Sequence, residues 1–245
     1  MSLKKLPTNN GYTIHQILVP SLGKKLRFRP FLVKENKALM VAQGSGDPNQ
    51  ILDTMRAIIE SCCVEKDGID GDKLATFDFE WLMVKLRSIS IDDKITVNVI
   101  CDDPHEGRSP ETRKQQLLVD LDNIELVDID KYNPRVELSK NLVVMMKVPT
   151  IDTVKNLPTG DDVDDSIKRI AMQIDKIYSD EEVYDMSEYS DEDIVDWISN
   201  LTESQFDKLF AYFDHIPYCR LVIEWTCPVC GKKNIRTVEG TENFF

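Results

Sequence analysis

A Cys-x-x-Cys-Gly motif, Cys227 to Gly231, lies between two runs of the chain that are rich in β-branched residues. The first run begins at Leu221 and the second extends from Ile235 to Val238, so the pattern predicts a hairpin with the motif in its turn. Two thiolates at this spacing make half of a tetrahedral zinc site, and Gly231 suits the left-handed conformation that such a turn needs. A redox Cys-x-x-Cys instead lies between a strand and the start of a helix. The sequence therefore predicts a zinc knuckle, which requires two further ligands from elsewhere in the chain.

One other stretch offers ligands of the right kind. The apolar run from Ile95 to Ile100 is followed by Cys101 and His105, in a loop rich in turn-forming residues. Together with the knuckle they predict a Cys3His zinc site that closes across more than half of the chain, and its four ligands are Cys101, His105, Cys227 and Cys230. Two alternatives stay open, because Asp102 or Asp103 can supply an oxygen ligand and His105 can be a solvated loop histidine.

Composition narrows the class of protein. The 245 residues, 42% of them hydrophobic, suffice for one large domain or two small ones with a buried core. No apolar run approaches membrane-spanning length and no signal-peptide pattern follows Met1, so we expect a cytoplasmic protein without a membrane partner. Six scattered cysteines do not resemble the disulfide framework of a secreted protein. The net charge of −13 disfavours nucleic-acid binding, which relies on concentrated Lys and Arg, and favours partners with basic surfaces.

The N-terminal part of the chain alternates between extended and helical patterns. Two extended runs, Tyr12–Leu18 and Lys25–Arg29, flank a turn and predict a hairpin. Three helices are expected next, and the second of them has Asp47 as its N-cap and Pro48 in its first turn. The expected helices cover Phe31–Gln43, a segment from Asp47 through Ile59, and a segment around Phe79–Leu86. Three or four strands should then form one antiparallel meander. They come from the runs Ile95–Ile100, Leu117–Leu126 and Val136–Val148, the last of which is broken by Ser139, Lys140 and Asn141.

The segment after Pro158 is acidic and helical in pattern. Apolar residues at helical spacing predict one helix from Ile167 to Ile177, followed by a polar connection from Tyr178 to Ser190. Two short helices with capping boxes should begin at Ser190 and Thr202. The predicted fold class is α+β: an antiparallel β-meander, a helical N-terminal segment, a C-terminal helical segment and a C-terminal zinc-knuckle hairpin. The expected divisions are 1–157, 158–217 and 218–245, with the knuckle packing back on the meander.

Motifs of common enzymes are absent from the sequence. There is no Gly-rich phosphate loop, no Gly-x-Ser-x-Gly and no His-Glu-x-x-His, and the whole chain has three histidines. We therefore expect neither a catalytic site nor a small-molecule substrate.

Several stretches together resemble a known family. They are Leu26–Leu39, Leu74–Ser90, and the ending with Cys227–Gly231 and Phe244-Phe245, and in this order they resemble the baseplate hub subunit and hub-assembly family of T-even-like contractile-tailed bacteriophages. Members of that family often carry a Cys-x-x-Cys both in mid-chain and near the end. Here Cys101 matches the first mid-chain thiol, whereas the second falls among Asp103, Pro104 and His105. The resemblance thus leaves two interpretations. Either His105 replaces the second mid-chain thiol as a ligand, or the mid-chain half of the site has been lost.

The resemblance implies a non-enzymatic role in virion assembly. It makes phage baseplate hub proteins the expected partners, with the protein either a hub subunit or an assembly factor. Its expected location is the host cytoplasm during assembly, and the tail baseplate of the virion if it is retained there. The sequence leaves two other classes to test, a nucleic-acid-binding zinc-ribbon regulatory protein and a zinc hydrolase, of which the second requires an open coordination position.

Overall fold

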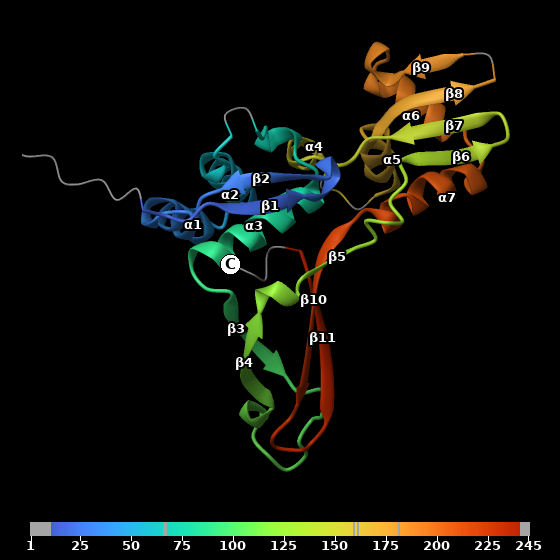
Figure 1. Ribbon diagram of the computed structural model, residues 1–245. Coiled ribbons are helices and arrows are strands. Elements are labelled where there is room, and N and C mark those ends of the chain that lie inside the picture. Colours follow the sequence, from blue (N-terminus) through green and yellow to red (C-terminus); the bar gives the residue numbers. More distant parts are fainter. Residues whose placement is uncertain (1–10, 66–67, 159, 161, 181, 241–245) are drawn as a thin grey trace, which may run out of the picture.

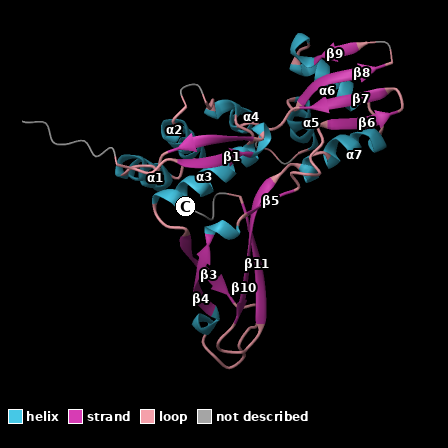
Figure 2. Ribbon diagram, viewed as in Figure 1, coloured by secondary structure: helices cyan, strands magenta, loops and turns pink. Residues whose placement is uncertain are grey.

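The computed structural model describes residues 11–240 except 66–67, 159, 161 and 181. It confirms the α+β class and has three parts (Figure 1): an N-terminal lobe with β1, β2 and α1–α4, a sheet lobe with β6–β9 and α5–α7, and a stalk made of the β3–β4 and β10–β11 hairpins with β5. Strands run along the stalk, whereas the longer helices lie in the two lobes (Figure 2). Phe244 and Phe245, which contribute to the family resemblance, lie outside the described residues.

The N-terminal lobe follows the sequence prediction closely, except that its fourth helix, Ile151–Asn156, was not predicted. Its hairpin joins β1 (His15–Val19) to β2 (Lys24–Phe28), and its helices are α1 (Val33–Ser45), α2 (Pro48–Cys62), α3 (Thr76–Ser90) and α4 (Ile151–Asn156). The Asp47 side chain accepts a hydrogen bond from Asn49 N, and Pro48 occupies the first turn of α2, so the predicted helix start is confirmed. The fully buried Phe28, Ile59 and Leu82 show how the hairpin, α2 and α3 share one core.

The strands expected to form one meander belong instead to three sheets. These strands are β3 (Lys94–Ile100), β4 (Lys114–Asp120), β5 (Glu125–Val127), β6 (Arg135–Ser139) and β7 (Leu142–Met146). β3 and β4 pair only with each other, because the chain turns away after Asp120 through a 3-10 turn that buries Leu121. β5 then pairs with β10 (Tyr218–Thr226), which also pairs with β11 (Lys233–Glu239). The prediction of a single meander was therefore wrong, since β5 finds its partner about ninety residues later in the chain.

The sheet lobe is a four-stranded antiparallel sheet covered by helices. The strand order is β6-β7-β8-β9, with β8 at Ile174–Ser179 and β9 at Val183–Asp185, and the helices are α5 (Val163–Ala171), α6 (Asp191–Ser199) and α7 (Glu203–Ala211). Both predicted helix starts are confirmed: Ser190 Oγ accepts from Asp193 N at 3.2 Å, and Gln205 Oε1 accepts from Thr202 N at 3.0 Å. Val144, Ile174, Ile198 and Leu209 meet in the core between sheet and helices.

The predicted helix from Ile167 to Ile177 is half helix and half strand. α5 ends at Ala171, and Ile174 and Ile177 lie in β8. Met145 pairs with Lys176 but Met146 pairs with Ile174, so Asp175 is an extra residue in the strand. This β-bulge places Ile174 and Ile177 on the same buried face, and the spacing of three that it creates mimics a helix in the sequence.

Two further predictions concern the connection from Tyr178 to Ser190 and the division of the chain at residue 157. The predicted polar connection from Tyr178 to Ser190 is wrong, because it contains most of the β8–β9 hairpin and the short helix Met186–Glu188. The division of the chain at residue 157 stays a prediction. The core of the sheet lobe takes residues from both sides of it, including Leu138 and Leu209.

Candidate metal centre

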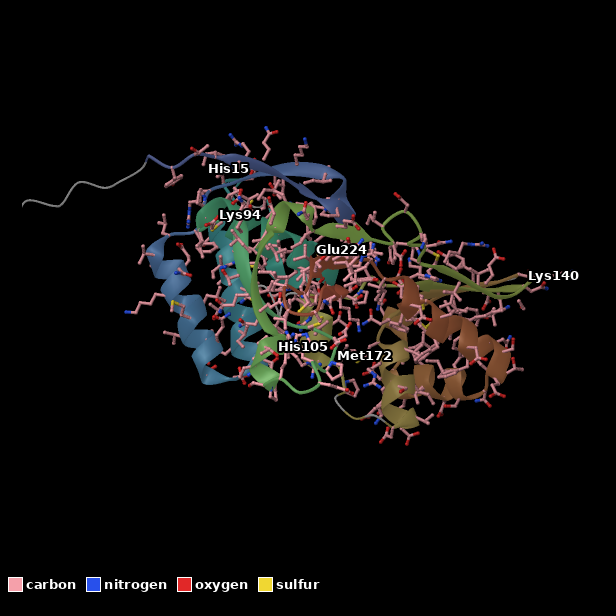
Figure 3. All side chains as sticks on the ribbon, turned by 90° about the horizontal axis from the view of Figure 1, so that it is seen from below. His15, Lys94, His105, Lys140, Met172 and Glu224 are labelled. Carbon is pink, nitrogen blue, oxygen red and sulfur yellow. The ribbon has the colours of Figure 1, made fainter. Side chains whose placement is uncertain are left out.

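The four predicted ligands come together at the end of the stalk. Cys101 follows β3, His105 lies in the loop between β3 and β4, and Cys227 and Cys230 lie in the turn between β10 and β11. Their ligand atoms all lie within 4.8 Å of one another. Figure 3 looks along the stalk from below and labels His105, with sulfur atoms drawn in yellow. Among the described residues, this is the one group of three or more Cys, His, Asp or Glu side chains so arranged.

The β10–β11 turn places its two cysteines through backbone hydrogen bonds. Cys227 N donates to Lys232 O at 2.8 Å, and Gly231 N donates to Cys227 O at 2.8 Å. Gly231 has φ of 75°, and a Cβ at this position would meet nothing within 4 Å. The glycine is therefore required by backbone conformation and not by space, and the hairpin predicted from the sequence is confirmed.

The β3–β4 loop is shaped by its own hydrogen bonds. His105 has a positive φ of 51°, which is unusual for a residue other than glycine, and its N–H donates to Asp103 Oδ1 at 2.8 Å. Cys101 is fixed by Arg113, the residue just before β4: the Cys101 N–H donates to Arg113 O and the Cys101 carbonyl accepts from Arg113 Nε, both at 2.9 Å. Asp103 thus uses its carboxylate on the loop itself, and neither it nor Asp102 belongs to the ligand cluster.

Three hydrogen bonds join the two hairpins around the cluster. Asp102 N donates to Oδ1 of the buried Asn234 at 3.0 Å, and Arg108 Nη1 donates to Val229 O at 3.2 Å. Gln115 Nε2 lies 3.2 Å from Cys227 Sγ and can donate to a thiolate there. The two hairpins are therefore held together by polar contacts as well as by the candidate ligands.

A threonine fixes the proton on the imidazole. Thr112 Oγ1 donates its only proton to Ser109 O at 2.7 Å, so its contact of 3.0 Å with His105 Nδ1 must be one in which Nδ1–H donates. Neutral His105 then carries a lone pair on Nε2, the atom that lies 3.5 Å from Cys227 Sγ. Hydrogen bonds of this kind orient the imidazoles that bind metals in proteins.

The spacing of the donor atoms fits a tetrahedral ion. Bond lengths of about 2.3 Å to sulfur and 2.0–2.1 Å to nitrogen require sulfur atoms about 3.8 Å apart and a sulfur and a nitrogen about 3.6 Å apart. Cys101 Sγ lies 3.7 Å from Cys230 Sγ, and Cys227 Sγ lies 3.5 Å from His105 Nε2. The separation of 3.7 Å between Cys101 Sγ and Cys230 Sγ is far longer than the roughly 2.05 Å of a disulfide, and all six cysteines are free.

The thiols of the turn differ in acidity. Burial acts to raise the pKa of Cys227, but the backbone amides of Cys230 and Val229 and the thiols of Cys230 and Cys101 outweigh it and bring this pKa down to about 6. The amide of Lys232 acts to lower the pKa of Cys230, yet burial and the neighbouring Cys227 and Cys101 give a net increase. The cluster therefore favours one thiolate at Cys227, the form in which cysteine binds a metal.

Sequence reasoning missed the residues that support the four candidate ligands. Thr112 orients His105, Gln115 points at Cys227, and Asn234 ties the loop to the hairpin. Thr and Gln within or beside a strand are common, so their types carry no signal. Their roles follow only from the pairing of two hairpins.

Comparison with known proteins gives one match. A family model described as T4 bacteriophage base plate protein matches residues 12–245. No curated protein and no solved structure gives a match. Among the described residues, no helix is both long and apolar enough to cross a membrane. Because the family model spans almost the whole chain, the protein belongs to the T4 bacteriophage base plate protein family.

Proposed function

We propose that this baseplate protein is a non-enzymatic part of the baseplate hub, acting as a hub subunit or as a factor in hub assembly, and that a structural zinc ion holds the end of its stalk. The hub role is supported by the resemblance of the segments that form β2, α1 and α3 to hub and hub-assembly proteins. Its partners are then other hub proteins, met first in the host cytoplasm.

The single observation that carries the zinc proposal is the geometry of the four donor atoms. The Cys101–Cys230 and Cys227–His105 pairs lie at separations that suit a tetrahedral zinc ion, and all four donor atoms lie within 4.8 Å of one another. Bound there, the ion would supply a cross-link between two hairpins that are distant in the sequence. Thr112 holds the proton of His105 on Nδ1, which leaves the lone pair on Nε2 free to bind the ion. Gln115 donates toward the Cys227 sulfur.

A structural role is favoured over catalysis by the number of ligands. Four protein ligands fill a tetrahedral site, whereas a zinc hydrolase keeps one position for water. Nucleic-acid binding is disfavoured by the net charge of −13. The function proposed is therefore one of protein–protein contact.

Metal analysis tests the zinc part of the proposal. Protein purified under reducing conditions without chelators should contain close to one zinc per chain, and Cys227→Ser should retain less than about a tenth of it. Cys63→Ser is the matched control, because Cys63 is a half-buried cysteine outside the cluster and should leave the zinc content unchanged. Wild-type protein without metal would rule out the zinc site.

Complementation tests the hub part. A phage with this gene inactivated should accumulate tails or baseplates that lack a complete hub, and supplied wild-type protein should restore them. Hubs that assemble normally without the protein would exclude the hub role, whatever the zinc content.

A further inference from the structure

A cavity of about 160 Å³ lies where the segment around α4 meets the sheet lobe. Its walls are mainly apolar and include Leu157 beside α4, Ile170 on α5, Phe210 on α7, and Phe213 in the short 3-10 helix after α7. Phe210 is 52% exposed, so the cavity has a large aromatic ring at its rim. Apolar side chains from both lobes thus surround a space that is accessible from outside.

Gln173 brings an unsatisfied amide to this cavity. The residue is 1% exposed, and neither Nε2 nor Oε1 has a hydrogen-bond partner among the described residues. Its backbone is fully used, since its N–H donates to Ile170 O and its carbonyl accepts from Lys147 N. A buried donor and acceptor without partners destabilise a fold, so such a group in a cavity points to a ligand that satisfies it.

The other two polar side chains at the cavity, Arg169 and Ser166, are already hydrogen-bonded. Ser166 Oγ donates to Asp162 O at 3.1 Å. Arg169 Nη1 donates to Gly160 O at 2.8 Å and to Pro158 O at 3.3 Å, and its Nη2 donates to Ser166 Oγ at 3.1 Å. Gln173 is consequently the group that would select a ligand. The ligand must combine an apolar body with one group able to donate to Oε1 or accept from Nε2.

A tyrosine side chain has both properties. An apolar cavity of about 150 Å³ accommodates benzene, so the space beside Gln173 matches one aromatic ring. A phenol hydroxyl donates and accepts, whereas phenylalanine and leucine would leave the amide unpaired. Tyrosine is also among the residues that most often anchor protein interfaces in pockets.

We propose that this cavity receives a tyrosine side chain from another baseplate polypeptide, with the hydroxyl bound by Gln173. This partner rests on the proposed function. The partner segment should also be basic near its tyrosine, because the whole chain has a net charge of −13 and Asp164 lies in the first turn of α5, close in sequence to the cavity residue Ser166. The neighbouring Asp165 is already paired with Lys168.

The probe for the site is p-cresol, the side chain of tyrosine, compared with toluene, which lacks the hydroxyl. Titration of the full-length protein followed by NMR should perturb Ile170 and the Gln173 side-chain amide. Gln173→Met keeps the length of the side chain but removes the amide, so the ratio of the toluene Kd to the p-cresol Kd should fall about fivefold to tenfold. Gln43→Met, the same change at an exposed position of α1, should leave that ratio unchanged. Phe210→Ala should weaken both probes alike.

Several outcomes would overturn the site. They are equal ratios in wild type and Gln173→Met, perturbations remote from the cavity, and a crystal soaked with p-cresol that shows only water on Gln173. If Gln173→Met fails to fold, the soaked wild-type crystal still decides, since the hydroxyl must lie about 3 Å from Gln173 Oε1 or Nε2.

The partner is tested separately by complementation. Gln173→Met should reduce hub assembly while zinc content stays full, and Gln43→Met should support normal assembly. Phenol binding with unaffected assembly by Gln173→Met would refute the baseplate partner alone. Phenol binding by a protein that proves unnecessary for the hub would refute the proposed function and leave the cavity site intact.

Discussion

The sheet lobe and the end of the stalk are both built from antiparallel strands, but they bury different kinds of side chains. The lobe places large aliphatic residues such as Ile174, Ile198 and Leu209 between its sheet and its helices. From Ile100 to Asp120 and from Glu224 to Thr237, by contrast, the buried residues are Cys101, His105, Cys227 and Asn234. The lobe is therefore stabilised by apolar burial, whereas the end of the stalk depends on polar contacts and on its candidate ligands.

Removal of the metal should produce the largest difference in stability between the end of the stalk and the sheet lobe. Zinc contributes about 10–16 kcal/mol of apparent binding free energy to small zinc domains, so chelation should open the end of the stalk and leave the sheet lobe folded. Hydrogen exchange should show the amides of Cys227 and Gly231 losing at least about a hundredfold protection, while the strands β7 and β8 keep theirs. Equal loss of protection in both regions would show that the stalk and the lobe unfold as one unit.

Truncation of a core side chain in the lobe should have the opposite effect, destabilising the lobe without affecting the metal site. Ile174→Ala removes a fully buried side chain and should lower the free energy of unfolding by about 2–5 kcal/mol without changing zinc content. Val183→Ala, at a position 59% exposed in the neighbouring strand β9, should change stability by less than about 0.5 kcal/mol. Denaturant unfolding measures both, and zinc loss in Ile174→Ala would indicate coupling between lobe and stalk.

The hydrogen bond from His105 to Thr112 should contribute to zinc affinity at the end of the stalk. Thr112→Val removes the oxygen that accepts from Nδ1–H and should weaken zinc binding about tenfold to a hundredfold. Thr112→Ser retains the hydroxyl and should bind zinc nearly as tightly as wild type. Competition with a chelator of known affinity gives the measurement, and equal affinities for Val and Ser would exclude the tautomer argument.

A helix cap in the lobe should give the smallest effect. Ser190→Ala removes the acceptor for Asp193 N and should lower the free energy of unfolding by about 1 kcal/mol. Ser199→Ala serves as its control, because Ser199 lies at the other end of α6 and its hydroxyl bonds only within that helix. Similar losses for the two variants would mean that the cap adds no stability of its own.

The sequence predicted local features better than pairings. The starts of helices at Pro48 and after Ser190 follow from side chains that bond to nearby amides, so a few residues determine them. The hairpin around Cys227 was likewise evident from its flanking strands. The pairing of β5 with β10 was not, because an edge strand of three residues carries too little pattern to specify a distant partner.

The candidate site shows the same division. Residue types and loop context suggested all four members of the cluster as candidate ligands, whereas their convergence depends on how two separate hairpins pack. In the lobe, the bulge at Asp175 turned a strand into an apparent helical pattern that no single sequence can resolve. Gln173, next to that bulge, gave no signal at all, since only its burial without a partner makes it notable.

The distance in sequence between the two halves of the ligand cluster has a consequence for synthesis. His105 and Cys227 touch across 122 residues, which a ribosome adds in about 6–24 s. During that time the nascent chain holds Cys101 and His105 but lacks the cysteines that complete the site. A chain released before Cys227 therefore carries only half of the candidate ligand set, so the proposed zinc, once bound, would distinguish finished from prematurely terminated copies.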